Sequence, residues 1–448
     1  MSLFTSDVQQ LGTPYWWEDG APLPDLPSQL PNKAELLIVG AGYTGLSAAI
    51  AAHDAGASVV VVDAGVPGCG ASSRNGGMFG AHPRVGMSDL AARFGEQTAT
   101  GIFNEARDAF DFTSNLIKNE GIECCFDQCG RIQMAWTEAH FKAQRELVAA
   151  LRSATSMNVE LVSHEQLKAE INSSCYFGAI RFPDHASVQP RQFHDGLMSA
   201  VLQRGIQVVQ QCAIQSIEKK ATHFVAKAEN GTRLVAEKVI MATNGYTSGK
   251  FGWFYRRVFP LPSFLIATEP LSSNLLDYLA PGRRMMVETR ARHSYFRISP
   301  DGTRVVFGGR ASMRAISAEH AAKRLFATMT QIWPELTDVK LTHSWMGNTG
   351  FTFTNMPQVG THNGLFYSMG YSGSGVALAP YLGAKVAWQA LDDDRGRTSY
   401  GNTAFKTNWI HPVAKPHFLK AASLWFDTAV DRQQDSQARR DWKQKQSE

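Results

Sequence analysis

The beginning of the chain alternates short apolar runs with one amphipathic segment. Residues 34–40 (AELLIVG) and 57–65 (ASVVVVDAG) are apolar runs of the length and composition typical of buried strands. Residues 44–56 between them have helical periodicity and end at Gly56, a residue type that favours the position after a helix. A strand, a turn, a helix and a second strand within about 30 residues predict a βαβ unit.

The rest of the chain mixes helical and alternating patterns. Helices are expected at 88–120, 138–155, 190–205 and 317–336. Strands are expected at 130–137, 206–218, 223–231, 237–245, 262–270, 293–302 and 303–310. Residues 364–391 return to a strand, a glycine turn and a helix. Because nucleotide-type segments at both ends bracket the antiparallel ones, the first domain is expected to be discontinuous.

These patterns predict an α/β fold (α+β overall), in which a Rossmann-like domain carries an inserted domain built on an antiparallel sheet. The expected ranges are 34–120, 187–255 and 340–425 for the Rossmann-like domain, and 121–186 and 256–339 for the inserted domain. Residues 1–33 are expected to form an arm on the folded body, because the segment is rich in Pro and its Tyr15, Trp16 and Trp17 would seldom stay solvated. Residues 426–448 are expected to be a charged tail.

Composition excludes several classes of protein. With 448 residues, 44% hydrophobic and 19% charged, the chain is an ordinary globular protein rather than a disordered one. The 44 Lys and Arg against 40 Asp and Glu leave a net charge of +4 and no dense basic stripe, which argues against a nucleic-acid partner.

Cysteine usage and the apolar stretches indicate the compartment. The cluster CCFDQC has the wrong spacing for a zinc site, so we expect reduced thiols and no metal. The N-terminus lacks the basic and apolar regions of a signal peptide. Gly and Ser interrupt the charge-free stretches 36–52 and 365–384, so stable membrane insertion is not expected. The sequence therefore predicts a cytoplasmic protein.

The most informative motif is Gly40-Ala41-Gly42-Tyr43-Thr44-Gly45, which follows an expected strand and opens an expected helix. In such a motif the first glycine allows a tight turn, the second lets the backbone approach a pyrophosphate, and the third lets helix and strand pack closely. Asp63 ends the second strand, about 20 residues later, where a carboxylate accepts hydrogen bonds from ribose. The motif predicts a dinucleotide site but does not choose between NAD and FAD.

Two further glycine-rich segments favour FAD. Residues 68–80 (GCGASSRNGGMFG) combine small residues, hydroxyls and amides, which suits a backbone that crosses close to a large planar ligand. Gly370, Gly373 and Gly375 precede a helix whose N-terminus would face a second electron-rich centre, such as the pyrimidine edge of a flavin. Either segment alone could be a plain loop or turn, but the three in this order are far more specific.

The order of these motifs is similar to that of the FAD-dependent D-amino-acid oxidase, glycine oxidase and sarcosine oxidase superfamily. The segments that carry the resemblance are VGAGYTGLSAAIAA, VVVVDA, GASSRNGGM, EKVIMATNGYT, SYFRISPDGTRVVFGGR, SWMGNTGFTFTNMPQVG and LFYSMGYSGSGVALAPYLG. The Pro-rich arm with its two Trp, GASSRNGG and GYSGSGVALAPYLG most resemble the γ-glutamylputrescine oxidase branch. The resemblance extends over about residues 12–425.

The resemblance implies which residues would bind FAD. They are Gly40, Gly42, Tyr43, Thr44, Gly45, Asp63, Ala64, Ser72, Ser73, Arg74, Asn75, Gly76, Gly77, Met78, Ala213, Ala242, Thr243, Gly245, Gly370, Tyr371, Ser372, Gly373, Ser374, Gly375 and Val376. Some relatives attach flavin through a cysteine near the C-terminus or a histidine beside the arginine-containing loop. Here no cysteine follows Cys212 and no histidine lies within 70–81, so non-covalent FAD is expected.

The substrate side rests on an arginine-rich segment that lines the substrate cavity in the family. If residues 290–297 form a strand pair, Arg290 and Arg292 share one face, and His293, Tyr295 and Arg297 share the other. Arginine suits a carboxylate or phosphonate because its donors form a two-pronged fork.

Other candidates lie outside that segment. Arg84 and His82, just after the glycine-rich loop, form a second candidate cluster. Any one of these arginines could equally belong to a solvated face. His343, which precedes Trp345 and another strand, is expected to be structural.

The implied reaction is oxidation of a C–N bond in a small amine or amino acid. A hydride passes to the flavin, water hydrolyses the imine to an aldehyde or ketone, and oxygen reoxidises the flavin to give hydrogen peroxide. The substrate would carry a carboxylate or phosphonate. The alternatives are a flavin-binding subunit of a heteromeric dehydrogenase that uses another electron carrier, an NAD-dependent dehydrogenase, and an oxidase acting on a tRNA side chain, which the mild charge disfavours.

Overall fold

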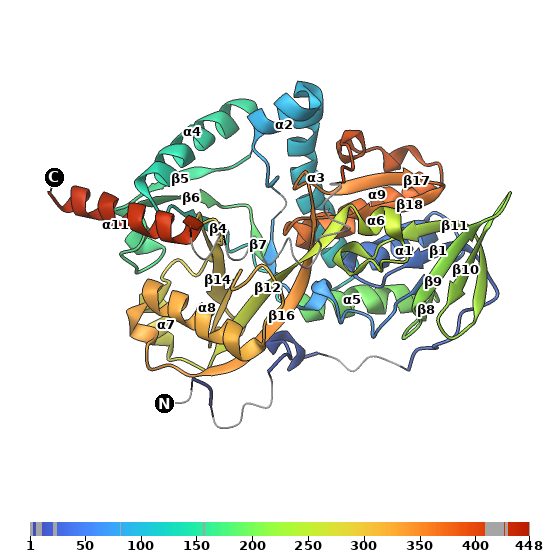
Figure 1. Cartoon of the computed structure of the whole chain (residues 1–448), viewed down its shortest axis with the longest axis horizontal. Coiled ribbons are helices and arrows are strands. Elements are labelled where there is room, and N and C mark those ends of the chain that lie inside the picture. Colours follow the sequence, from blue (N-terminus) through green and yellow to red (C-terminus); the bar gives the residue numbers. More distant parts are fainter. Residues whose placement is uncertain are drawn as a thin grey trace.

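The structure is a computed structural model, and it describes residues 3–5, 11–20, 25–80, 82–155, 157–407, 425 and 429–447. Two lobes lie side by side, each built around its own large sheet (Figure 1). This arrangement confirms the predicted fold class, a mixed α/β chain with a Rossmann-like part and a second part built on a mainly antiparallel sheet.

The first sheet has the parallel core that the βαβ pattern predicts. Its strands are β1 (Lys33–Val39), β2 (Val59–Val62), β8 (Gln207–Val209), β9 (Ile214–Lys219), β10 (Phe224–Ala228), β11 (Arg233–Met241), β17 (Gln358–His362) and β18 (Leu365–Met369). Strands run in the order β17-β18-β11-β1-β2-β8, and β10 and β9 extend from β11. β1 lies parallel to both β2 and β11, and β2 lies between β1 and β8, with all four of its residues buried.

The second sheet is antiparallel except where β13 lies parallel to β4. Its strands are β4 (Arg131–Met134), β5 (Glu160–Ser163), β6 (Gly178–Phe182), β12 (Val258–Thr268), β13 (Met285–Glu288), β14 (Ser294–Ile298), β15 (Val305–Gly309) and β16 (Leu341–Thr352). They run in the order β16-β12-β15-β14-β13-β4-β6-β5. A short pair, β3 (Met78–Phe79) with β7 (Ala186–Ser187), lies apart from both sheets.

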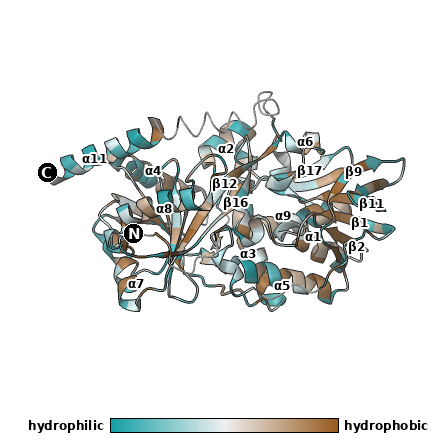
Figure 2. Ribbon diagram, turned by 60° about the horizontal axis from the view of Figure 1, so that its bottom comes forward, coloured by the Kyte–Doolittle hydropathy of each residue, from teal (hydrophilic) through white to brown (hydrophobic). Residues whose placement is uncertain are grey.

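Helices cover both sheets. The α-helices are α1 (Tyr43–Asp54), α2 (Met87–Phe94), α3 (Glu96–Asn119), α4 (Glu138–Ala154), α5 (Pro190–Gln203), α6 (Gly252–Tyr255), α7 (Ser273–Leu279), α8 (Ala318–Ile332), α9 (Gly375–Ala390) and α11 (Asp431–Ser447). In Figure 2 the strands of the first sheet are largely brown and α11 is mostly teal, which places the apolar residues inside and the charged helix outside.

Four expectations differ from the structure. Gly95, with φ +86°, divides the helix expected at 88–120 into α2 and α3. Gln211, with φ +50°, divides the strand expected at 206–218 into β8 and β9. β16 pairs along its length with β12 and so belongs to the second sheet, although the predicted boundary at residue 340 placed it in the Rossmann-like domain.

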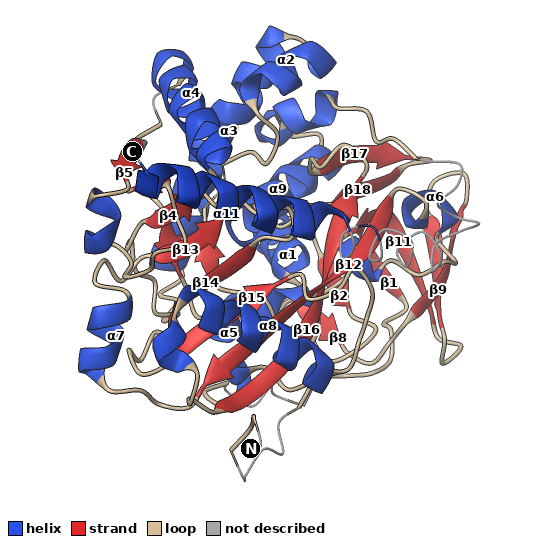
Figure 3. Cartoon of the chain, turned by 60° about the vertical axis from the view of Figure 1, so that its left-hand side comes forward, coloured by secondary structure: helices blue, strands red, loops and turns tan. Residues whose placement is uncertain are grey.

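The fourth difference is the expected tail, which contains the helix α11. Figure 3 shows this helix lying across the second sheet. Its Asp431 pairs with Arg292, its Gln434 accepts a hydrogen bond from the backbone of Ala291, and its Trp442 packs against Phe177. Among the described residues, no helix is long and apolar enough to span a membrane.

Helices α1 and α9 cross so closely that only glycine fits at residue 383. A Cβ on Gly383 would lie 2.3 Å from the carbonyl oxygen of Thr44. The close crossing places the N-termini of both helices at the same end of the first sheet, where they take part in the site described below.

Replacing Gly383 by Ala tests this crossing. Relieving the clash requires the backbone to move and costs up to about 3 kcal/mol, whereas alanine gains only ~1 kcal/mol in helix propensity. We therefore expect Gly383→Ala to lower the midpoint of thermal unfolding. The control is Gly252→Ala at the start of α6, where the added Cβ meets nothing within 4 Å. Equal midpoints for the two variants would contradict the close crossing.

Candidate active site

A cavity of about 420 Å³ lies at the carboxyl end of β1 in the first lobe. The N-terminus of α1 opens onto it, and Gly42, the residue before the helix, offers no side chain to cap the free backbone N–H groups. Such a helix end favours an anion, because its N–H groups and its dipole both point toward the ligand.

The glycines of the first motif are needed because the backbone is crowded around this cavity. Gly40 has φ +112°, and a Cβ there would lie 2.8 Å from the carbonyl oxygen of Ala242. A Cβ on Gly42 would lie 2.9 Å from Ser72 Oγ, the atom that accepts a hydrogen bond from Tyr43 N. The cradle therefore has room for phosphate groups only while these positions lack side chains.

Asp63 lines this cavity and binds two backbone N–H groups beside it. Its two carboxylate oxygens accept hydrogen bonds from Ala41 N at 2.8 Å and Gly65 N at 2.9 Å. Burial raises the pKa of this carboxyl, and the two backbone N–H groups oppose that effect. Each oxygen keeps a second lone pair, so the carboxylate can also accept hydrogen bonds from ribose hydroxyls.

The third glycine-rich segment meets the first at the N-terminus of α9. Tyr371 OH lies 2.7 Å from Thr44 Oγ1 and 2.8 Å from Ser368 Oγ, which joins α1 to the end of β18. Ser374 precedes α9 without capping it, so the first N–H groups of α9 are open to a ligand in the cavities that Gly375 and Val376 line.

The structure brings most of the predicted cofactor residues to the cavities. Six of them, all named in the sequence prediction, have their contacts elsewhere: Gly45, Ser73, Gly77, Gly245, Gly370 and Ser372. Their roles are in packing and loop geometry. A Cβ on Gly45 would lie 1.8 Å from the carbonyl oxygen of Gly40, and one on Gly245 would lie 3.0 Å from Gly350 on β16.

The N-terminal arm fastens the glycine-rich loop at 71–77. Tyr15 and Trp16 are buried as expected. Trp16 Nε1 donates to the carbonyl oxygen of Asn75 at 2.7 Å, and Trp17 Nε1 donates to Ser73 Oγ at 2.8 Å. The two Trp residues of the arm fix the loop in place, and we call these contacts the brace. Because the arm is far from the loop in sequence, no local motif predicts the brace.

Arg74 and Trp345 complete this brace. Arg74 Nη1 donates to the carbonyl oxygens of Gly12 and Met346, and its guanidinium lies 4.6 Å from the ring centre of Trp17. Trp345 Nε1 donates to the carbonyl oxygen of Arg74 at 3.0 Å. His343, predicted to be structural, is buried beside Thr342 and lines neither cavity.

A second cavity of about 510 Å³ adjoins the first, between the two lobes. The two cavities share several lining residues: Ala71, Asn75, Thr349, Gly373 and Val376. A long ligand such as FAD can therefore extend from the first cavity to the edge of the second. The face of the second sheet that carries Tyr295, whose OH lies 2.9 Å from Ser263 Oγ, forms the opposite wall.

The predicted substrate residues separate into two groups. Arg84, Arg290, His293 and Tyr295 line the second cavity, as does His82. Arg292 and Arg297 do not. Arg297 is buried beneath the loop at 71–77 and donates to the carbonyl oxygens of Gly77 and Val188. Its guanidinium therefore fixes the backbone in place and does not face the substrate cavity.

The strand-face interpretation of Arg290 and Arg292 is wrong, because residues 289–293 form the turn between β13 and β14. Arg292 pairs with Asp431 of α11. Arg290 reaches the cavity, but its Nε and Nη2 donate to the two oxygens of the buried carboxylate of Glu288, at 2.7 and 2.8 Å. Its charge is therefore already neutralised.

Two arginines that the sequence interpretation did not single out line the same cavity. Arg131 begins β4, and Arg310 directly follows β15. Burial lowers the pKa of each to about 9, so both remain cationic at neutral pH. The available signal was a lone arginine at one end of a strand, the half-buried β4 or the buried β15. Only the pairing of distant strands shows that both arginines face one cavity.

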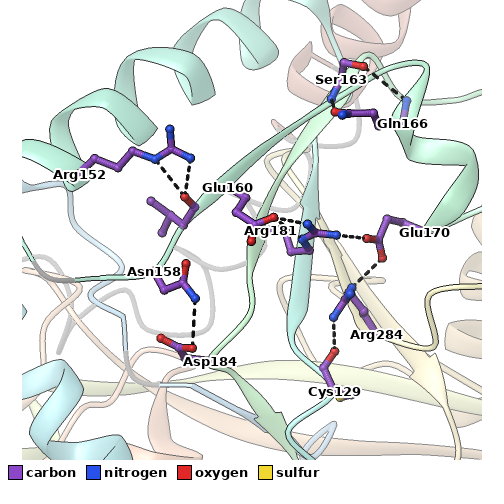
Figure 4. Close-up of polar contacts among 11 residues, drawn as sticks. Cys129, Arg152, Asn158, Glu160, Ser163, Gln166, Glu170, Arg181, Asp184 and Arg284 are labelled. Carbon is purple, nitrogen blue, oxygen red and sulfur yellow. Dashed lines mark hydrogen bonds and ion pairs between the residues drawn. The ribbon is translucent and has the colours of Figure 1, made fainter.

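Among the described residues, no carboxylate lies within ion-pair distance of Arg84, Arg131 or Arg310. Arginines elsewhere in this lobe are different. In Figure 4, Arg181 and Arg284 share the two oxygens of Glu170, each at 2.7 Å. The cavity thus concentrates positive charge that protein carboxylates do not compensate, which favours an anionic ligand.

Histidines in this cavity do not add to its charge. Burial lowers the pKa of His293 well below its usual value, and the nearby Arg310, Arg84 and Arg131 lower it further. Burial and Arg131 have the same effect on His82 and His185. All three imidazoles are therefore neutral at pH 7, and the same arginines oppose their protonation.

Comparison with known proteins identifies the family. Residues 35–389 match the family model described as FAD dependent oxidoreductase. The chain belongs to this family. The match confirms the resemblance drawn from the motifs and identifies FAD as the cofactor of this oxidoreductase.

Individual relatives cover most of the chain. A probable oxidoreductase, OrdL, of Rhizobium meliloti (strain 1021) is 30% identical over 382 residues, which cover 84% of this chain and 88% of the relative. Gamma-glutamylputrescine oxidoreductase of Escherichia coli (strain K12) is 26% identical over 355 residues, 79% of this chain and 82% of that protein. Glycine oxidase from Geobacillus kaustophilus superposes with a TM-score of 0.69 at 18% identity, over 85% of this chain and 99% of the solved one.

Replacing Asp63 by Ala should weaken FAD binding. A hydrogen bond from ribose to a charged acceptor contributes about 1.5–3 kcal/mol, and loss of the carboxylate also frees the N–H groups of Ala41 and Gly65. We expect a dissociation constant for FAD at least about tenfold higher, measured by equilibrium dialysis. The control is Asp89→Ala on the exposed face of α2. An unchanged constant in Asp63→Ala would remove this carboxylate from the cofactor site.

Weakening the brace between the arm and the loop at 71–77 should also weaken FAD binding. Trp17→Phe keeps the aromatic ring but removes the donor to Ser73, which costs about 1 kcal/mol, or roughly fivefold in FAD affinity. Tyr15→Phe is the matched control, because it removes one hydrogen bond of the same arm, to Asp301, that does not contact the loop. Fluorescence titration of FAD measures both. Equal affinities in the two variants would show that the arm does not hold the loop.

Proposed function

We propose that this FAD-dependent oxidoreductase oxidises the C–N bond of a small amine or amino acid that carries a carboxylate or phosphonate. FAD would lie non-covalently in the first cavity, with its phosphates at the N-terminus of α1, its ribose at Asp63 and its ring system between Asn75 and Gly373. The observation that carries the proposal is the set of arginines, Arg84, Arg131 and Arg310, that face the second cavity without carboxylate partners among the described residues.

These arginines would do more than bind an anion. Positive charge around an amine disfavours its protonated form, so the cavity lowers the pKa of a bound ammonium group. The amine must be neutral for its lone pair to assist loss of a hydride from the adjacent carbon. His293 lines the cavity as a neutral imidazole and adds no charge there, and the proton that the ammonium releases passes to water.

Bound FAD supplies the acceptor for the hydride, and the chain positions the amine and excludes water. The oxidised product is an imine, which water hydrolyses to an aldehyde or ketone and a second amine or ammonia. We propose that oxygen is the final electron acceptor, which gives hydrogen peroxide. Similarity to a gamma-glutamylputrescine oxidoreductase and to a glycine oxidase supports oxidation of an amine.

A substrate screen tests the proposal. Amines with a carboxylate should be oxidised with a kcat/KM at least about 30-fold above that of their uncharged amides, because a charge-assisted pair in a desolvated pocket contributes about 2–5 kcal/mol. Reduction of the bound flavin without oxygen measures the oxidation itself, and peroxide release measures the acceptor. Equal rates for acids and amides would contradict the anion site. Flavin reduction without peroxide would favour a dehydrogenase that uses another electron carrier.

The proposed charge effect on the amine predicts a pH dependence. In the enzyme–substrate complex, kcat should rise with pH as the ammonium loses its proton. Arg310→Met removes one positive charge, so the pKa of the bound ammonium rises. The rising part of the plot of kcat against pH, the ascending limb, then moves to higher pH. The matched control, Arg314→Met, removes an exposed arginine outside the cavity and should leave the limb in place. An unmoved limb in Arg310→Met would contradict the effect.

A further inference from the structure

The unpaired arginines of the second cavity form two separate groups. Extending the proposed function, on which this inference rests, we propose that the substrate carries two anionic groups, one for each arginine group, with the reacting C–N bond between them. The class is a secondary amine or amino acid with a carboxylate or phosphonate at both ends.

The first group lies beside the segment 370–376. Arg84 and Arg310 both stack on Phe351 of β16, with their guanidinium carbons 5.4 and 4.6 Å from its ring centre. Arg84 Nη1 donates to the carbonyl oxygen of Ser372 at 3.3 Å and would lie 3.5 Å from a Cβ on Gly373. Two cations on one ring make a site for one carboxylate or phosphonate next to the expected flavin ring.

The second group is Arg131, which rests on a different ring from Arg84 and Arg310. Arg131 stacks on Phe182 of β6, with its guanidinium carbon 4.6 Å from the ring centre. Its Nη2 lies 2.9 Å from His82 Nε2, which must accept that hydrogen bond because arginine only donates. Its Nε is buried and has no partner among the described residues. An anion in the cavity would supply the acceptor that this guanidinium lacks.

The order of strands keeps the two groups apart. Arg310 follows β15 and Arg131 begins β4, and β14 and β13 lie between these strands. Three steps between strands amount to about 14 Å between the two backbones. The rings on which the arginines stack are further apart still, since β16 is one edge of the sheet and β6 lies next to the other edge. The two groups therefore start from separate strands and rest on separate rings, so each can pair with an anionic group of its own.

Between the two groups the wall of the cavity carries no net charge. His293 and Tyr295 face this stretch, and the charges of Glu288 and Arg290 neutralise each other. Burial keeps His293 neutral and raises the pKa of Tyr295 to about 12. A neutral amine nitrogen fits this middle region, whereas a carboxylate can pair only with the arginines on either side of it. The charge pattern of the cavity thus matches a substrate that is anionic at both ends.

Kinetics on the FAD-loaded enzyme test the pattern. N-(2-carboxyethyl)glycine and N-propylglycine have similar shapes, but only the first has a second carboxylate. We expect its kcat/KM to be at least about 30-fold higher, as for one charge-assisted pair in a desolvated pocket. Iminodiacetate and N-(3-carboxypropyl)glycine vary the spacing and should give a distinct optimum. If N-propylglycine matches every diacid, the inference is wrong and the proposed anionic amine stands. If propylamine matches N-propylglycine, the proposed function itself is wrong.

Variants of the arginines test which of them binds the second carboxylate of the substrate. Arg131→Met should remove the advantage of the preferred diacid and change the rate with N-propylglycine less than about threefold, whereas Arg310→Met should impair both substrates. Arg131→Lys keeps the charge and should restore part of the advantage. Arg314→Met, the exposed control, should change neither substrate. Flavin absorbance and the unfolding midpoint show that each variant is folded and loaded. An advantage that survives Arg131→Met would overturn the assignment.

A binding measurement gives a result even where turnover is slow. Glutarate carries two carboxylates and cannot be oxidised as an amine, and its monomethyl ester carries one. Calorimetric titration should show glutarate binding at least about 30-fold more tightly than the ester, and Arg131→Met should abolish the difference. Equal affinities for glutarate and its ester in the wild-type enzyme would overturn the inference.

Discussion

Positive charge without a carboxylate partner is the constraint that organises the second cavity. Burying a guanidinium is costly unless an anion pairs with it, and protein carboxylates normally supply that anion, as Glu170 does for Arg181 and Arg284. In the cavity, Arg131 and Arg310 are partly buried and rest on aromatic rings instead, and the more exposed Arg84 binds a backbone carbonyl. The fold maintains this arrangement at a cost in stability, which an anionic substrate would recover on binding.

The loop at 71–77 connects this charged cavity to the first cavity, where we propose that FAD binds. Ala71 and Asn75 line both, so the position of the loop sets where a bound cofactor would meet a substrate. Segments that are distant in sequence fix this loop in place. Trp16 and Trp17 of the arm and Trp345 of β16 all donate hydrogen bonds to it. Packing between the two lobes therefore governs the geometry of the reaction as much as the glycine motifs do.

The local chemistry of the sequence predicts the first lobe, and it names many of the residues that line the first cavity. Apolar runs, the glycine motif and Asp63 lie close together in sequence, and each carries its own signal. The arginines show the limit of that reasoning. The density of arginine at 290–297 drew attention to Arg292 and Arg297, which bind Asp431 and backbone carbonyls, whereas Arg131 and Arg310 are isolated in sequence and meet only through strand order. Which arginine lacks a partner is a property of tertiary structure.

The most direct test of the central claim is a titration of the FAD-loaded enzyme with propionate and with propionamide, followed by the visible difference spectrum of the flavin. The two ligands have nearly the same shape, but only the acid carries a charge. The account predicts saturable binding of propionate, at least about 30-fold tighter than that of the amide. Equal affinities would show that the arginines of the cavity do not select an anion.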